Sequence, residues 1–224
     1  GHAMRAWLHL LATESPAIAV ARQSLEAARS LPANHRETGH LAAIEALIAG
    51  RWHAAGRILE DVSVEHPHDA LALQVGHQLD FFTGNARMLR DRIARALPHW
   101  SPVMPGYHAV LGMHAFGLEE TGDYSRAEAA GRRAVEIEPR DGWAQHAVAH
   151  VMEMEGRRHD GVAWMRANPD AWSRESFFAV HNWWHLALFH LGLDQVDETL
   201  ALFDERVDGS GSTIVLEMVD ASAM

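Results

Sequence analysis

Apolar residues recur at spacings of three and four positions along almost the whole chain of 224 residues, which is the period of an amphipathic α-helix. Val, Ile and Thr do not alternate with polar residues over lengths that would support a β-strand. The longest apolar runs, such as the one over residues 41–49, are far shorter than a membrane span. The pattern therefore predicts an all-α protein and no association with a membrane.

A repeat of 34 residues organises these helices, and its clearest copy covers residues 108–141. Gly122 and Tyr124 stand at the turn between the two helices of this copy, small Ala127 and Ala134 follow, and Pro139 comes at its end. Glycine permits the left-handed conformation that closes a helix, small residues allow helices to approach closely, and proline stops the second helix. These positions are characteristic of the tetratricopeptide repeat.

The same frame fits the rest of the chain with varying fidelity. Further copies or helical pairs cover residues 3–30, 36–69, 70–98, 142–168 and 180–207. We therefore predict about six helical hairpins that form a right-handed αα superhelix, in a single solenoid over residues 1–224. Both ends lack a polar capping helix, so we expect the chain to belong to a longer repeat array or to form a homo-oligomer through these ends.

The net charge and the absence of cysteine limit which binding partners and which cellular compartment we expect. The formal net charge is −11, which argues against binding to the phosphate backbone of a nucleic acid. The chain has no cysteine, so disulfides, thiolate metal sites and cysteine nucleophiles are excluded, and a reducing, cytoplasmic location is favoured.

Histidine is unusually frequent, with 17 residues, and two of the histidines lie one helical turn apart in the copy that begins at residue 142. Trp143, His146, His150 and Glu153 fall within an arc of about 80° on one helix face. Two imidazoles at i and i+4 with a carboxylate three residues on can converge on a divalent metal. In the alternative interpretation, these residues form the polar face of a groove or a structural histidine pair instead of binding a metal.

The next copy contains a second pair at the same spacing, His181 and His185, with Trp184 between them. If its first helix stands beside that of the preceding copy, the two pairs form a cluster of four imidazoles. Such a cluster would suit zinc or iron, or a proton-transfer site.

Histidines also recur near the same place in five successive first helices, at spacings of 35 to 37 residues: His40, His77, His114, His150 and His185. This spacing indicates a shared functional face, to which Glu119 belongs by its repeat position. The register is imperfect, so some of these histidines are alternatively buried hydrogen-bonding groups.

Five segments carry a more specific resemblance. They are GHQLDFFTG at 76–84, MLRDR at 88–92, AFGLEETGDY at 115–124, WAQHAVAHV at 143–151 and HNWWHLALFH at 181–190. Together they resemble the tetratricopeptide repeat protein 38 family and its bacterial relatives, whose members are longer at both ends. Residues 219–222 also resemble a segment of that family. The resemblance implies the repeat fold and this set of motif residues, and it implies no reaction.

Two functions follow from these patterns. The first is a repeat protein that binds a small molecule or a peptide in a concave groove rich in His and Trp. Its expected ligand-binding residues are His77, His114, Glu119, Trp143, His146, His150, Glu153, His181, Trp184 and His185, with a divalent metal, zinc or iron, at His146, His150 and Glu153. The second is an enzyme that uses the four histidines with a metal or as an acid and base. A third interpretation is a scaffold whose histidines are structural.

No phosphate-binding loop, GxSxG elbow, dinucleotide-binding glycine motif or HExxH motif occurs in the sequence. The enzyme hypothesis therefore rests on the histidine cluster alone.

Overall fold

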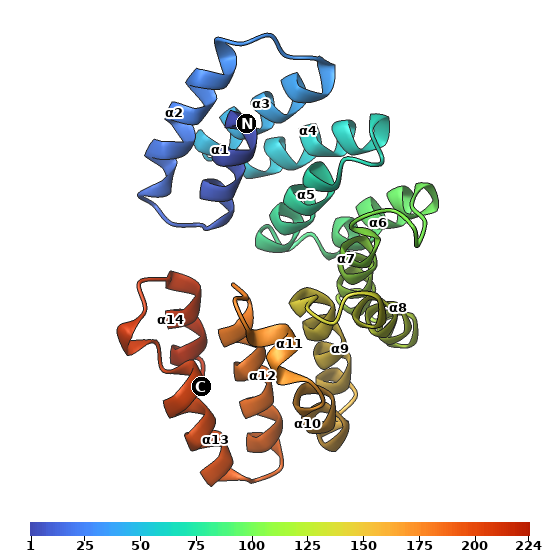
Figure 1. Ribbon diagram of the computed structural model, residues 1–224, viewed down its shortest axis with the longest axis vertical. Helices are drawn as coiled ribbons and strands as arrows, with labels where there is room; N and C mark the ends of the chain where they lie inside the picture. The colour runs from blue at the N-terminus through green and yellow to red at the C-terminus, as the bar shows by residue number, and fades with distance from the viewer. The chain divides into compact units, whose positions relative to one another are not determined.

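The computed structural model describes residues 1–208 and 210–224, and within these residues it is built from helices, without a β-strand (Figure 1). The α-helices are α1 (His2–Leu11), α2 (Ala17–Arg29), α3 (His35–Ile48), α4 (Trp52–Glu65), α5 (Ala70–Phe82), α6 (Ala86–Ala96), α7 (Tyr107–Glu119), α8 (Tyr124–Ile137), α9 (Gly142–Met154), α10 (Arg158–Arg166), α11 (Pro169–Ser173), α12 (Ala179–Gly192), α13 (Val196–Leu202) and α14 (Val215–Ser222). The predicted all-α class is confirmed. None of the described helices is long and apolar enough to cross a membrane.

Most of the helices follow one another as pairs joined by tight turns. The pairs are α1 with α2, α3 with α4, α5 with α6, α7 with α8, α9 with α10, and α12 with α13. The predicted turn glycine Gly122 has φ of 81°, in the left-handed region that a residue without a Cβ enters at no steric cost. The equivalent turn between α12 and α13 uses Asp194 at φ of 58°, because Asp tolerates this conformation better than most residues.

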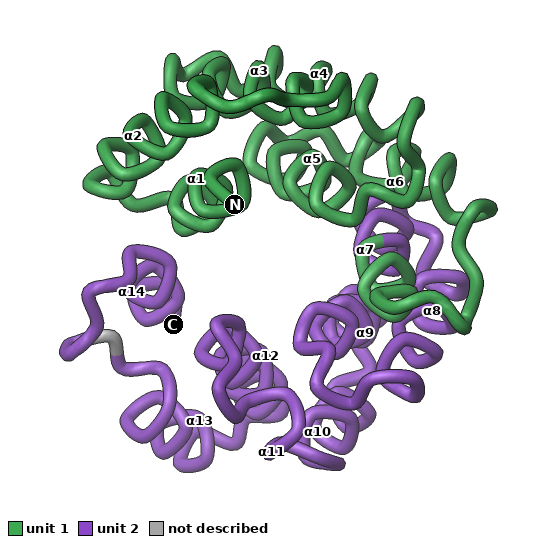
Figure 2. The backbone as a smooth tube through the Cα atoms, turned by 45° about the horizontal axis from the view of Figure 1, so that its top comes forward, with its two compact units in different colours: residues 1–113 green, residues 114–224 purple. Residues whose placement is uncertain are grey.

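The chain divides into two compact units, residues 1–113 and residues 114–224, which Figure 2 shows in different colours. In the first unit, apolar residues of α1 to α5 fill the core, and they include the fully buried Trp7, Ile44 and Leu59. A second, smaller core in this unit lies around Leu73 and Ile93. These are the helix faces that the three- and four-residue spacing of apolar positions predicts.

The interior of the first unit also holds charged groups. Arg92 is 2% exposed, and its guanidinium contacts the carboxylates of Asp80, at 2.8 Å, and Glu60, at 2.9 Å. A Cβ at position 76 would collide with this guanidinium, so Gly76 is the residue that lets Arg92 lie against α5. A buried cation needs such paired anions, because an unpaired buried charge is costly.

In the second unit the core lies around Met152, Met165, Trp172 and Phe189, all at most 1% exposed. The ring of Phe189, on α12, rests on Gly161 of α10, where a Cβ would collide with it. This close approach fixes α12 against α10, and α12 also contacts α9 and α14. The packing brings the histidine-bearing helices α9 and α12 side by side.

Candidate functional site

The predicted histidine pairs lie on α9 and α12. Asp141 begins α9 by accepting a hydrogen bond from the backbone N–H of Ala144, as an N-cap residue does. Asn182, which is fully buried within α12, donates a hydrogen bond from Nδ2 to the carbonyl of Gly142 at 3.1 Å. This polar residue in an apolar helix therefore ties α12 to the first turn of α9.

The four imidazoles of these helices converge. Each of His146, His150, His181 and His185 offers a ring nitrogen, and all four nitrogens lie within 4.8 Å of one another. The Nε2 atom of His181 is 3.1 Å from Nε2 of His146 and 3.2 Å from Nε2 of His185. Ligand nitrogens around a tetrahedral zinc ion are separated by about 3.4 Å, given zinc–nitrogen bonds of 2.0 to 2.1 Å. The two contacts of His181 are close to this spacing.

Asp220 of α14 orients one of these rings, because its Oδ1 atom accepts a hydrogen bond from Nδ1 of His181 at 3.0 Å. A carboxylate behind an imidazole fixes the tautomer and turns the lone pair of Nε2 toward the opposite side. Nε2 of His181 then has one acceptor position and two imidazole nitrogens within reach, so a hydrogen bond can satisfy only one of the two contacts. A cation between the three nitrogens would satisfy all of them.

Burial keeps two of the four rings neutral. His146 is 3% exposed and His185 is 4% exposed. Burial, together with the neighbouring imidazoles, holds the pKa of both side chains well below the usual histidine value. In each ring the buried Nδ1 atom lacks a hydrogen-bond partner. A neutral imidazole with a free lone pair is the form that binds a metal.

Aromatic side chains surround the cluster. Trp143, which is 37% exposed, stacks on Phe178 with ring centroids 4.2 Å apart, and the Phe178 ring is 4.8 Å from that of His146. Trp184 stacks on His181 at 5.4 Å. Phe116 of α7 packs against His146 at 5.4 Å, so the four imidazoles stand within an apolar surround with Trp143 at its exposed side.

Two glutamates adjoin His150. Glu119, at the end of α7, is 5% exposed, and its Oε2 atom lies 3.3 Å from Nδ1 of His150. Glu120 follows, and the ligand atoms of Glu119, Glu120 and His150 lie within 4.8 Å of one another. Glu120 is exposed as a residue, but partial burial of its carboxyl raises the pKa of this group, and the neighbouring Glu119 raises it further.

The predicted metal set of His146, His150 and Glu153 is thus only partly brought together. Glu153 belongs to none of the described groups of metal-ligating residues, whereas His181 and His185 join the other two histidines. Trp143 and Trp184, predicted as walls of the site, lie beside His146 and His181, and Glu119, predicted on the shared histidine face, lies beside His150.

The remaining histidines of the predicted shared face belong to none of the described groups of metal-ligating residues. His77 belongs to the first unit, where it is buried and Nδ1 donates a hydrogen bond to the carbonyl of Leu89 at 3.2 Å. His40 is also buried in that unit, accepting a hydrogen bond from Nε1 of Trp7 and donating one to Asp69. His114 is 7% exposed and joins no described group of metal ligands.

Four residues near the cluster were not predicted as site residues: Phe116, Glu120, Phe178 and Asp220. Phe178 lies three residues before His181, and Glu120 directly follows the predicted Glu119. Their nearness in sequence to predicted site residues could have identified both as candidates. Asp220 lies 39 residues after its partner His181, and only its place in a segment resembling a known family pointed to it.

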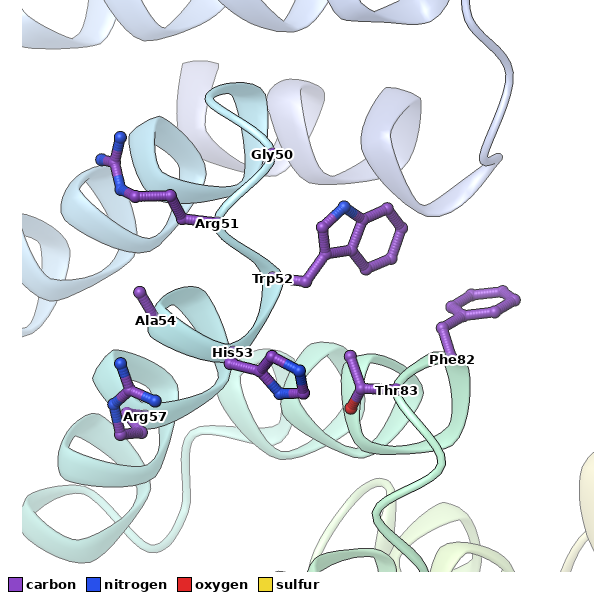
Figure 3. A pocket seen from close by; sticks show the side chains of 8 residues that line it. All are labelled: Gly50, Arg51, Trp52, His53, Ala54, Arg57, Phe82 and Thr83. Atoms are coloured by element: carbon purple, nitrogen blue, oxygen red, sulfur yellow. The ribbon is translucent and has the colours of Figure 1, made fainter.

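A pocket of about 810 Å³ occurs elsewhere, in the first unit, and Figure 3 shows the side chains that line it. Trp52 at the start of α4 and Phe82 at the end of α5 form its aromatic wall, with ring centroids 6.0 Å apart. The cations Arg51 and Arg57 line it and are solvent-exposed. The pocket contains none of the predicted site residues.

Comparisons with known proteins bear on the fold. No protein-family model matches the chain. The chain is similar to the crystal structure of TTC0263, a thermophilic TPR protein of Thermus thermophilus, with a TM-score of 0.59 and 19% sequence identity over 84% of this chain and 98% of that chain. The chain has a tetratricopeptide-like helical-repeat fold. The repeats predicted from the sequence are thereby confirmed, and the resemblance to the tetratricopeptide repeat protein 38 family stays a prediction.

The burial of His77 predicts how stability depends on pH. Burial lowers the pKa of His77 to about 3, helped by the charge of Arg92 and opposed by the Leu89 carbonyl. Between pH 6.5 and that value the unfolded chain binds a proton here that the folded protein does not, so the free energy of unfolding falls as the pH falls. We expect His77→Asn to lower the slope of this free energy against pH by about 1.4 kcal/mol per pH unit between about pH 6 and pH 4.

Urea titrations at several pH values measure this slope. The control is His53→Asn on the exposed side of α4, which should leave the slope as it is in the unmodified chain. An unchanged slope in His77→Asn would contradict the prediction, whatever the variant does to stability at neutral pH.

Proposed function

We propose that this protein holds a divalent transition-metal ion at His146, His150, His181 and His185, and that a small molecule or a peptide binds at this metal against the neighbouring tryptophans. The convergence of the four ring nitrogens within 4.8 Å carries the proposal. The Asp220 carboxylate behind His181 supports it, because metal-bound imidazoles commonly have such a partner.

The donor set indicates which metals fit. Neutral imidazole suits zinc, iron, copper and nickel, whereas calcium and magnesium prefer oxygen ligands. Four imidazoles fill the tetrahedral shell of zinc, so that a ligand would bind zinc as a fifth donor, while an iron with six positions keeps two of them open for a ligand. Zinc or iron is therefore the expected occupant, and iron leaves more room for an exogenous group.

The side chains around the cluster indicate the ligand. Trp143 is partly exposed, stacks on Phe178, and has its ring centroid 6.5 Å from that of His146. An aromatic face at this place can hold a planar or apolar group next to the metal. The expected ligand is a small molecule or a peptide that carries a metal-binding group beside an aromatic or apolar one.

A second candidate is an enzyme that uses the same cluster. The lowered pKa of His146 and His185 favours it, because a neutral imidazole can accept a proton or hold a metal that acidifies its bound water. Both candidates require the four histidines, and turnover of a bound ligand separates them.

Metal content tests the proposal. Protein purified without a metal-affinity column should retain at least one equivalent of zinc or iron by inductively coupled plasma mass spectrometry, because four neutral imidazoles form a tight site. The variant His146→Ala/His150→Ala should lose this metal and keep its helical circular dichroism.

The matched control is His53→Ala/His159→Ala, which removes two exposed histidines from other helices and should retain the metal. Metal that is absent from the unmodified chain, or lost equally from both variants, would contradict the proposal. A helical-repeat scaffold for protein interaction, with structural histidines, would then be the favoured function.

The exposed ring of Trp143 beside the four histidines predicts a ligand preference. Benzohydroxamate should bind the Co²⁺-loaded protein roughly two- to tenfold more tightly than acetohydroxamate, because an aromatic stack adds about 0.5 to 1.5 kcal/mol. Trp143→Ala should bring the two affinities together, whereas Phe177→Ala, which removes an exposed phenylalanine of the same unit, should preserve the preference. Changes in the visible spectrum of Co²⁺ report the binding, and equal affinities in the unmodified chain would contradict the role of Trp143.

A further inference from the structure

We infer that a second divalent cation binds at Glu119, Glu120 and His150, so that His150 stands between an oxygen-rich site and the four-histidine site. The inference rests in part on the proposed function, because His150 belongs to both groups of ligands. The two sites differ in their donors, and this difference makes them separable by experiment.

The geometry of Glu119 points to a ligand. Its side chain is 5% exposed, and the buried Oε2 atom has no hydrogen-bond donor although Nδ1 of His150 is 3.3 Å away. A buried carboxylate oxygen without a donor is costly unless a cation balances its charge. The Glu120 carboxylate and the His150 ring offer the additional ligand atoms within 4.8 Å.

The two adjacent glutamates carry charges of the same sign. Adjacent carboxylates repel each other when both are ionised. A divalent cation between the two carboxylates would remove the repulsion, which is how bound cations change the balance of charge in carboxylate sites.

A single imidazole can serve two sites because it has two ring nitrogens. The Nδ1 atom of His150 faces Glu119, while its ring lies 4.1 Å from the ring of His146 and 4.7 Å from that of His185, measured between centroids. The ring therefore lies beside both the Glu119 carboxylate and the imidazoles of His146 and His185.

The donors predict different metal preferences at the two sites. Two carboxylates and one imidazole suit manganese, magnesium and similar harder cations, which compete poorly for a site made of imidazole alone. Mn²⁺ is thus a selective probe of the oxygen-rich site when the four-histidine site already holds Zn²⁺.

The test is a Mn²⁺ titration of the full chain loaded with one equivalent of Zn²⁺, followed by the electron paramagnetic resonance signal of free Mn²⁺. The unmodified chain should bind one further equivalent as Mn²⁺. Glu119→Gln/Glu120→Gln should weaken Mn²⁺ binding at least tenfold and retain Zn²⁺. The control Asp204→Asn/Glu205→Gln, which neutralises an exposed acidic pair of the same unit, should bind Mn²⁺ as the unmodified chain does.

Because Glu119 is buried, the single variant Glu120→Gln, at an exposed residue, gives a second measurement that does not depend on replacing a buried side chain. It should also weaken Mn²⁺ binding at least tenfold. Equal Mn²⁺ affinity in the unmodified chain and in Glu120→Gln would overturn the inference, as would an equal loss in the Asp204/Glu205 control.

The same data separate this inference from the proposed function. Zn²⁺ retained with no selective Mn²⁺ binding leaves the four-histidine site and removes the second one. Mn²⁺ bound through Glu119 and Glu120 in a chain that does not retain Zn²⁺ leaves the oxygen-rich site and contradicts the proposed function. Binding of neither metal contradicts both.

Discussion

The packing of α12 against α9 buries His146 and His185 with one unpartnered nitrogen in each ring, and the candidate site depends on this constraint. Such groups cost free energy in the absence of a partner, and their lowered pKa shows that protonation does not relieve the cost. The hydrogen bond from Asn182 to α9 and the contact of Phe189 with Gly161 hold the helices in this arrangement. The fold thus keeps the imidazoles together, with Nε2 of His146 and of His185 both directed at Nε2 of His181.

Two buried histidines outside the cluster, His40 and His190, have partners on both ring nitrogens. Both nitrogens of His40 have partners, Nε1–H of Trp7 on one side and the Asp69 carboxylate on the other. His190 likewise lies between Gln195 and the guanidinium of Arg166. His146 and His185 differ from this pattern within the same fold. The convergence of their Nε2 atoms on His181 therefore points to a ligand better than their burial alone does.

The sequence was sufficient for the fold and for the centre of the candidate site, because both depend on local periodicity. The repeat frame predicted the helical pairs, and the spacing of His146 to His150 and of His181 to His185 put each pair on one helix face. Glu153 shares that face, but it lies seven residues from His146, about 10.5 Å along the helix axis. The angular position of a side chain on a helix does not give its position along the axis.

The neighbours of the cluster depend on how separate helices pack, which no periodicity specifies. Asp220 comes from α14 and Phe116 from α7, and each reaches the imidazoles across a helix interface. Glu119 was predicted from its repeat position, whereas its pairing with Glu120 beside His150 emerged only from the structure. His40 and His77 share the repeat spacing of the cluster histidines, yet the first unit buries them as hydrogen-bonding groups.

X-ray absorption spectroscopy at the zinc edge, on the chain loaded with one equivalent of Zn²⁺, tests the central claim most directly. The account predicts a first shell of nitrogen atoms at about 2.0 to 2.1 Å, with the outer-shell scattering of several imidazoles, and a loss of part of that scattering in His181→Ala. A shell made mainly of oxygen atoms, or an imidazole contribution that His181→Ala leaves unchanged, would contradict it.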